Sequence, residues 1–193
     1  MVTGATTTFL ARGYAGTSMR TIAAAAGVSV PTVELLFGTK AAVLKAAIDV
    51  AIAGDDEEVP VLERQWTVRA EQLVDAGEFL ALAAAVITPA QQRSAGLVLA
   101  VLEAAPLDDD LARLAAQLID QRLTTARWAV AMLSTKAALR PELTPSTAAD
   151  TLWMLMDPAV FDRLVRQRHW SPEQYQTWFA ESARRLLVPD APH

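Results

Sequence analysis

The sequence has no cysteine among its 193 residues, which excludes disulfide bridges and thiolate metal sites. It has no uninterrupted run of about 18 apolar residues, as a transmembrane helix would need. Its first residues also lack the basic and then apolar pattern of an export signal. These absences predict a cytoplasmic protein with no membrane partner.

Motifs for catalysis are also missing. The sequence shows no phosphate-binding glycine loop, no nucleophile elbow and no pair of metal ligands four residues apart. It has two histidines, His169 and the terminal His193, and we expect His169 to be a surface or interface residue. The acidic run 108–110 fits the start of a helix, where carboxylates cap the backbone and favour the macrodipole. We therefore expect no enzyme, no cofactor and no metal site.

Positive charge is scarce, with a formal net charge of −5, although affinity for a DNA duplex depends largely on neutralising its phosphates. The charge is unevenly distributed. Residues 1–53 carry four Lys or Arg and two Asp or Glu, a net charge of +2, whereas the remaining residues carry 13 and 20, a net charge of −7. The N-terminal part therefore remains compatible with DNA.

The chain is rich in apolar residues that favour helices. Hydrophobic residues make up 52% of it, alanine and leucine dominate, and apolar residues rarely alternate as they do in a strand. This composition predicts an all-α fold. An acidic run between Gly54 and Pro60 marks a boundary. We expect a three-helix helix-turn-helix DNA-binding head within residues 1–53, and a larger helical bundle for ligand binding and dimerisation over residues 54–193.

Glycine stops and hydroxyl caps predict the helices of the head. In the first helix we expect Phe9 and Leu10 to be the apolar anchors, and in the third we expect Val33, Leu36 and Phe37 to point inward. A fourth helix follows and carries an apolar stripe. The four helices should end at Gly13, Gly27, Gly38 and Gly54.

In the larger part, Thr144 and Ser171 each precede a proline at a first helical position, and Ser171 with Gln174 makes a capping box. The Asp157–Pro158 pair should bend the helix that contains it, because proline removes a backbone hydrogen bond. Helices are predicted near residues 61–75, 76–104 (kinked or divided at Pro89), 108–138, 145–168 and 172–187.

The segment Gly13–Lys40 contains two short helices around a tight turn at Ala26-Gly27-Val28. This spacing is typical of a helix-turn-helix, in which the first helix contacts the duplex backbone and the N-terminal end of the second enters the major groove. The segment therefore predicts DNA binding.

At this segment the sequence resembles the tetracycline-repressor-like (TetR/AcrR) regulator family, over about 50 residues. The resemblance implies a homodimer that blocks a promoter on double-stranded operator DNA until a small-molecule effector, bound within the body, moves the two heads out of register. The matching positions are Gly13-Tyr14, Thr17-Ser18, Ile22-Ala23, Ala26-Gly27-Val28-Ser29, Phe37 and Thr39-Lys40.

Candidate DNA contacts follow from the resemblance and from side-chain chemistry. Family members use the positions of Thr17 and Lys40 against the DNA backbone, and Arg20 and Thr21 are further candidates for phosphate. On the third helix, short side chains suit base edges and thymine methyl groups. The groove-facing candidates are Ser29, Val30 and Thr32, with Leu35 as an additional position.

Two departures from the family bear on affinity. Family members often have a tyrosine where this chain has Glu34, and a carboxylate repels phosphate. Glu34 either turns away to pair with a neighbour such as Arg20, or it weakens DNA binding. Family members also have several further residues, often basic, before the first helix, and a truncated or mis-assigned start would explain the difference.

Aromatic and methionine side chains in the larger part either line an effector site or form plain core. The last two helices each carry an apolar stripe, part of which the body of the same subunit can cover. The family resemblance implies an intersubunit four-helix bundle made from two helices of each chain, and we favour this dimer. The residues predicted for ligand binding are Trp66, Phe79, Trp128, Met132 and Met154.

Two functional hypotheses remain from the sequence. The first is a dimeric, sequence-specific transcriptional regulator, a repressor released by a small apolar or amphipathic ligand. The second is a small-molecule binding protein of the same fold whose DNA binding is weak or lost.

Overall fold

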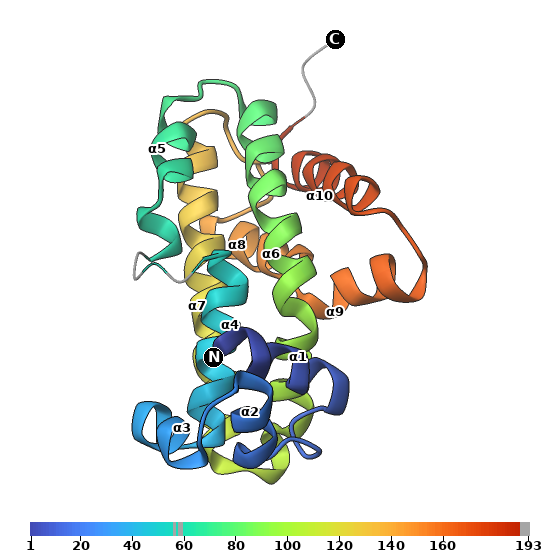
Figure 1. Cartoon of the computed structure of the whole chain (residues 1–193). Coiled ribbons are helices and arrows are strands. Elements are labelled where there is room, and N and C mark those ends of the chain that lie inside the picture. The colour runs from blue at the N-terminus through green and yellow to red at the C-terminus, as the bar shows by residue number, and fades with distance from the viewer. Residues whose placement is uncertain (56, 58–59, 190–193) are drawn as a thin grey trace. The chain divides into compact units, whose positions relative to one another are not determined.

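The computed structural model describes residues 1–55, 57 and 60–189. These residues form helices and connecting turns and contain no strand (Figure 1), which confirms the predicted all-α fold. They divide into a first unit, residues 1–57 and 93–118, and a second unit, residues 58–92 and 119–193. Part of the acidic run taken as the boundary, residues 56, 58 and 59, lies outside the described residues, and the division at residue 53 stays a prediction.

The head of the first unit has four helices, each preceded or followed by the expected capping residue. The side chains of Ser18, Ser29 and Thr39 each accept a hydrogen bond from the backbone N–H three residues later, which begins α2, α3 and α4. Gly27 ends α2 in the left-handed region, with φ +67°. The bounds are α1 Val2–Arg12, α2 Met19–Ala26, α3 Val30–Phe37 and α4 Lys40–Ala53.

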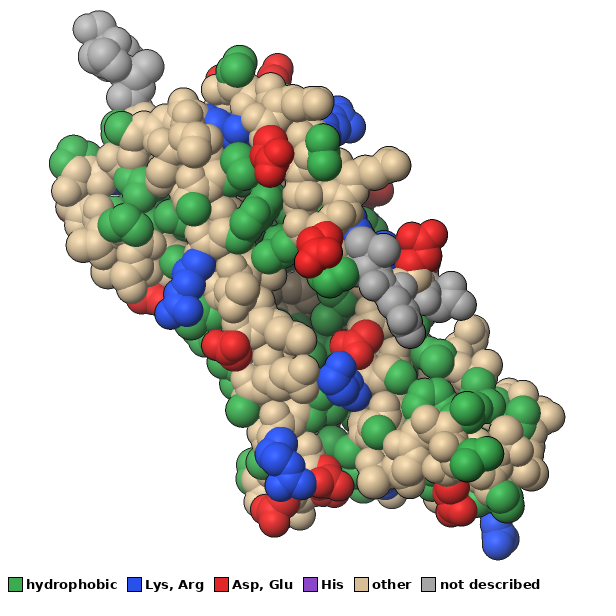
Figure 2. All heavy atoms as spheres, turned by 90° about the vertical axis from the view of Figure 1, so that its left-hand side faces the viewer, with side chains coloured by type: hydrophobic (Ala, Val, Ile, Leu, Met, Phe, Trp, Pro, Cys, Tyr) green, Lys and Arg blue, Asp and Glu red, His purple; other side chains and the backbone are tan. Residues whose placement is uncertain are grey.

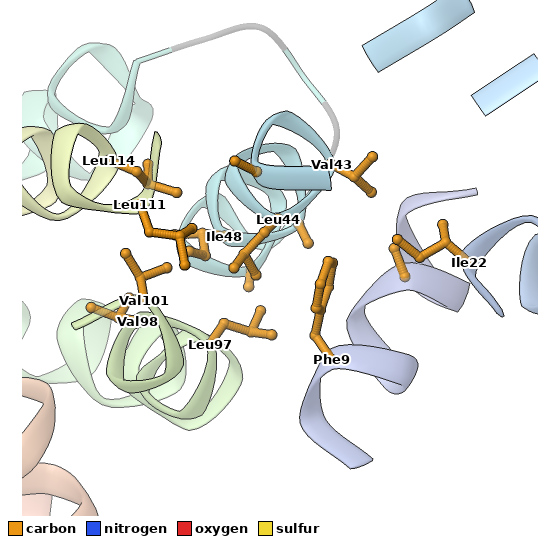
Figure 3. Close-up of a cluster of buried hydrophobic side chains, with 14 of the residues drawn as sticks. Phe9, Ile22, Val43, Leu44, Ile48, Leu97, Val98, Val101, Leu111 and Leu114 are labelled. Carbon is orange, nitrogen blue, oxygen red and sulfur yellow. The ribbon is translucent and has the colours of Figure 1, made fainter. Parts of the chain in front are cut away.

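Two long helices, α6 (Ala76–Ala104) and α7 (Asp109–Ser134), contribute residues to both units. In the first unit their side chains join the core of the head. Figure 3 shows Phe9 beside Leu44, and Ile48 facing the side chains of α6 and α7. The fully buried members of this core are Phe9, Ile22, Val33, Val43, Leu44, Ile48, Leu97, Val101 and Leu111.

Two predicted core positions of the head are wrong. Leu10 is 50% exposed and Leu36 is 61% exposed. Leu10 lies about 100° around α1 from Phe9, whose buried side chain fills the core. On α3, Leu36 lies one turn after the buried Val33, at the edge of the inward face, and its side chain stays largely exposed.

The second unit contains a 3₁₀ turn (Val61–Glu63), the helices α5 (Gln65–Gln72), α8 (Pro145–Leu155), α9 (Pro158–Phe161) and α10 (Pro172–Leu187), and a π-helical segment at Asp162–Gln167. The helix predicted over 145–168 is therefore divided where Asp157 caps the new helix at Pro158. Pro89, in contrast, lies inside α6 without dividing it.

Within the described residues, no single helix combines the length and hydropathy of a membrane span. The pair α2 and α3 reaches that hydropathy only when the two helices are taken together, and they are bent by 105° at the turn between them.

Candidate nucleic-acid interface

The α2–α3 unit has the geometry of a helix-turn-helix. The 105° bend between the two helices lies in the range of about 90–120° that is typical of this motif. At the turn, Gly27 donates its backbone N–H to Ala23 and Ala24, which closes α2 before α3 begins. Because Gly27 has positive φ, an L side chain at this position would strain the turn.

Helix α3 exposes the side chains expected to read DNA. Ser29 is exposed, Val30 and Thr32 are half-buried, and Leu35 is 87% exposed. The Ser29 and Thr32 hydroxyl oxygens lie 2.8 Å apart, and Ser29 also accepts the Thr32 backbone N–H. The face of α3 therefore combines two hydroxyls with an exposed leucine, which suits base edges and thymine methyl groups.

Thr17 is held inside the fold. Its side chain is 2% exposed, and its hydroxyl donates a hydrogen bond to the Gly13 carbonyl oxygen at 2.7 Å. The hydroxyl thus stabilises the turn between α1 and α2, a role that the sequence pattern did not reveal. A phosphate contact by Thr17 stays a prediction.

Lys40 has an internal role as well. Its ammonium donates hydrogen bonds to the carbonyl oxygens of Tyr14 and Thr17, each at 2.9 Å, and lies 3.9 Å from the centroid of the Tyr14 ring. Burial lowers the pKa of Lys40, and the charge of Asp108 opposes this shift. The Lys40 side chain therefore joins the loop before α2 to the start of α4.

Tyr14 connects the same loop to α7. Its ring stacks on Phe9, and its hydroxyl forms a hydrogen bond with Asp108. Burial, and then the charges of Asp108 and Asp110, raise the pKa of Tyr14 to about 12. Asp108 also accepts the backbone N–H of Leu111 at 3.1 Å, which confirms its predicted capping role. The sequence could not reveal the Tyr14 contact, because the two residues are far apart in the chain.

Positive charge at the head surface comes mainly from Arg12 and Arg20, both exposed. Lys45 forms an ion pair with Asp49 at 2.6 Å. Glu34 is exposed, and the described residues contain no ion pair between it and Arg20. On the face shown in Figure 2, basic and acidic side chains are scattered rather than gathered in one basic patch. The head therefore has little net attraction for phosphate.

Three of the five residues predicted for ligand binding form an aromatic cluster in the second unit. Trp128 lies edge-on to Trp66, with ring centroids 5.0 Å apart, and 6.4 Å from Phe79. Met132 is half-buried one turn after Trp128 on α7. Met154, on α8, is 55% exposed and is not part of this cluster. The rings pack on one another, and ligand binding by these residues stays a prediction.

The second unit also contains a polar cluster that was not predicted from the sequence. Arg122 of α7 forms an ion pair with Asp157 at 2.8 Å, and its guanidinium lies 4.4 Å from the centroid of the Trp153 ring. Burial lowers the pKa of Arg122, and the Asp157 carboxylate opposes this shift. An alternation of charged and apolar residues along α7 was the only available signal, and it does not distinguish Arg122 from exposed arginines.

Residues 2–47 match the family model described as bacterial regulatory proteins, tetR family. No curated protein matches the chain. Its structure is similar to that of the transcriptional regulator FadR from Bacillus subtilis, solved with stearoyl-CoA, with TM-score 0.72, 16% identity, and coverage of 94% of this chain and 95% of FadR.

Two further solved structures are similar over nearly the whole chain. A regulator from Saccharomonospora viridis, solved with choline, has TM-score 0.69 and 17% identity, with 98% of this chain and 96% of that chain covered. NalD, described as the secondary repressor of the MexAB-OprM multidrug efflux pump in Pseudomonas aeruginosa, has TM-score 0.67 and 21% identity, with 98% and 96% covered. These likenesses confirm the fold of head and body that the resemblance implied.

Proposed function

We propose that this chain is a dimeric, sequence-specific DNA-binding transcriptional regulator, because residues 2–47 match the model of the tetR family of bacterial regulatory proteins. The observation that carries the proposal is the complete helix-turn-helix, with α3 capped at Ser29 and its outer face exposed. Such a regulator acts on DNA in the cytoplasm.

In this proposal the N-terminal end of α3 enters the major groove, where Ser29, Val30 and Thr32 contact base edges. Arg20, in the first turn of α2, contacts phosphate. Thr21 stays a candidate contact, although its hydroxyl donates to the Ser18 carbonyl oxygen at 2.8 Å in the cap of α2. The side chains of Thr17 and Lys40 are already engaged inside the head. They contribute to the backbone contact by holding the starts of α2 and α4, whose free backbone N–H groups suit phosphate.

Each head provides little positive charge, and Glu34 adds a negative charge beside the groove. A dimer presents two heads to two half-sites, so that the second contact forms at high effective concentration. The predicted apolar stripes of the last two helices are largely buried within the single chain, as at Leu152, Tyr175 and Phe179. Support for a dimer comes instead from other apolar side chains on these helices, Met154 and Leu186, at 55% and 48% exposure. We therefore propose that DNA binding by this chain depends on the homodimer.

The body is proposed to bind a small apolar or amphipathic effector that releases the repressor from DNA. Regulators of similar structure were solved with stearoyl-CoA and with choline, and NalD is described as a repressor. The aromatic cluster around Trp128, together with the half-buried Met132, offers apolar surface for such a ligand.

The proposal is tested by footprinting of the full chain at low salt on the DNA around its own gene. We expect protection of a site with two half-sites about one helical turn apart, and a roughly uniform loss of affinity with a smaller salt dependence for Arg20→Ala. Arg69→Ala, an exposed arginine of α5, is the matched control and should bind as the native chain does. Absence of any protected site would overturn the proposal.

A second candidate function is small-molecule binding by the same fold after loss of DNA binding. Glu34 favours it, because its side chain is exposed on α3 and forms no ion pair within the described part of the chain. If Glu34 is the cause, Glu34→Tyr should raise non-specific affinity for duplex DNA sharply, and Glu34→Gln should raise it less. Unchanged affinity in both variants would count against this candidate.

A further inference from the structure

The second unit contains buried hydrogen-bonding groups that have no partner in the fold. They are the Thr88 hydroxyl, Nε of Arg122 and Nε1 of Trp153. Buried polar groups are nearly always paired, and an unpaired one is costly. Arginine Nε and tryptophan Nε1 are donors only, so whatever satisfies them must bring an acceptor atom.

Two of these donors belong to one stacked pair. The Arg122 guanidinium lies 4.4 Å from the centroid of the Trp153 ring, and the Arg122 side chain is 13% exposed. Two carbonyl oxygens at the adjacent end of α8 already accept hydrogen bonds from side chains. Gln91 donates to the Met156 carbonyl oxygen at 2.6 Å, and Tyr175 donates to that of Leu155 at 3.3 Å.

Thr88 joins the same region through helix geometry. It precedes Gln91 by one turn on α6, so the two side chains share a face, and Gln91 reaches the break between α8 and α9. The unpaired groups therefore come from α6, α7 and α8. The neighbouring Leu152 and Ala126, on α8 and α7, are buried and apolar.

The charges of the cluster favour an uncharged acceptor. Asp157 neutralises Arg122 at 2.8 Å and is fixed in place, because its other carboxylate oxygen accepts the Ala159 backbone N–H at 2.8 Å. An anionic group would be repelled by Asp157, and a cationic group by Arg122. A carbonyl oxygen instead has two lone pairs for two N–H donors and adds no charge to a buried site.

We propose that Arg122 and Trp153 bind the carbonyl oxygen of an uncharged apolar effector, of the ketone or ester class. This inference rests on the proposed function, since it assigns the chemistry of the effector that the body binds. Buried apolar side chains such as Leu152 contact the remainder of the ligand.

The test uses the full chain, labelled with ¹⁵N, and three probes of equal chain length: 2-octanone, octanoate and octylammonium. We expect 2-octanone to bind at least ten-fold more tightly than either charged probe, and to move the Trp153 indole N–H signal downfield in a saturable way. The Trp153→Phe variant assigns that signal and, because it retains an aromatic ring but no N–H donor, should reduce 2-octanone affinity several-fold. Arg122→Lys, which keeps the charge but removes Nε, should do the same.

Trp170→Phe is the matched control, because the Trp170 ring packs against Trp178, and it should bind 2-octanone unchanged. Equal or tighter binding of octanoate would overturn the charge argument, and 2-octanone binding that leaves the Trp153 signal unmoved would overturn the site. If the Trp153 indole N–H contacts a long-lived water and its signal responds to none of the probes, water alone satisfies the donors. That result would also overturn the site. Each of these results leaves the footprinting test of DNA binding independent, so failure of this site is distinguishable from failure of the proposed function.

Discussion

The two units of the molecule satisfy their buried polar groups in different ways. In the head, the buried Thr17 hydroxyl donates to the Gly13 carbonyl oxygen, and the partly buried Lys40 ammonium donates to the carbonyl oxygens of Tyr14 and Thr17. Within the described residues, the buried side-chain atoms left without a partner, on Thr88, Arg122 and Trp153, all belong to the second unit. The head is thus complete as it stands, whereas the body contains groups that a ligand can satisfy.

The largest effect is expected from the core of the head. Phe9, on α1, is 1% exposed. Phe9→Ala should lower the free energy of unfolding by about 3–5 kcal/mol, because it leaves a cavity in a well-packed core. Urea denaturation measures this change. Leu10→Ala, next to it and half exposed, should cost no more than about 0.5 kcal/mol, and equal costs at the two positions would contradict the buried position of Phe9.

The ion pair of the body should come next. Arg122→Met leaves Asp157 without its partner and should cost about 2–3 kcal/mol, somewhat less than a fully buried pair because both side chains are slightly exposed. Adding Asp157→Asn removes the orphaned charge and retains a side chain able to cap α9. The double variant should recover most of the loss in urea denaturation, and a further loss of stability would disprove the electrostatic explanation.

Capping residues offer a direct comparison of the two units. Ser18 and Ser171 both form capping boxes, with Thr21 and Gln174. Ser→Ala at either position should cost about 1 kcal/mol, since a cap acts locally in either unit, and Ser→Asp should retain most of the stability. A cost confined to one unit, measured by thermal and urea unfolding, would show that the caps depend on tertiary context.

The smallest effect is expected from alkaline pH. The folded pKa of Tyr14 is about 12, above its ordinary value of 10.0, so the fold favours the protonated hydroxyl. Its contribution to stability is present below pH 10 and is lost as the pH rises from about 10 to 12. Tyr14→Phe should flatten this part of the stability profile.

Tyr175, in the second unit, is the matched comparison. Burial, and then the charge of Asp157, raise its pKa as well, so Tyr175→Phe should also flatten the loss above pH 10. An unchanged alkaline profile in either variant would show that the pKa of the corresponding hydroxyl is the same in the folded and the unfolded chain.

The helix-turn-helix was predictable because its signals are local. Gly27, the serine and threonine caps, and Pro31 act within one or two turns of the helices that they bound. The division of the helix near Asp157 was also foreseen as a bend, because proline acts on its own backbone. Exposure of Leu36 was not foreseen, since periodicity locates an apolar stripe but does not state which neighbouring helix covers its edge.

The sequence by itself therefore determined the helices, their ends and the DNA-binding form of the head, because propensity, capping and periodicity act over a few residues. Only the tertiary structure decided which polar side chains meet: Lys40 with the loop at Tyr14, Tyr14 with Asp108, and Arg122 with Asp157 and Trp153. These pairs join residues from 26 to 94 positions apart in the chain. Their contacts depend on how helices pack, and no local pattern records that packing.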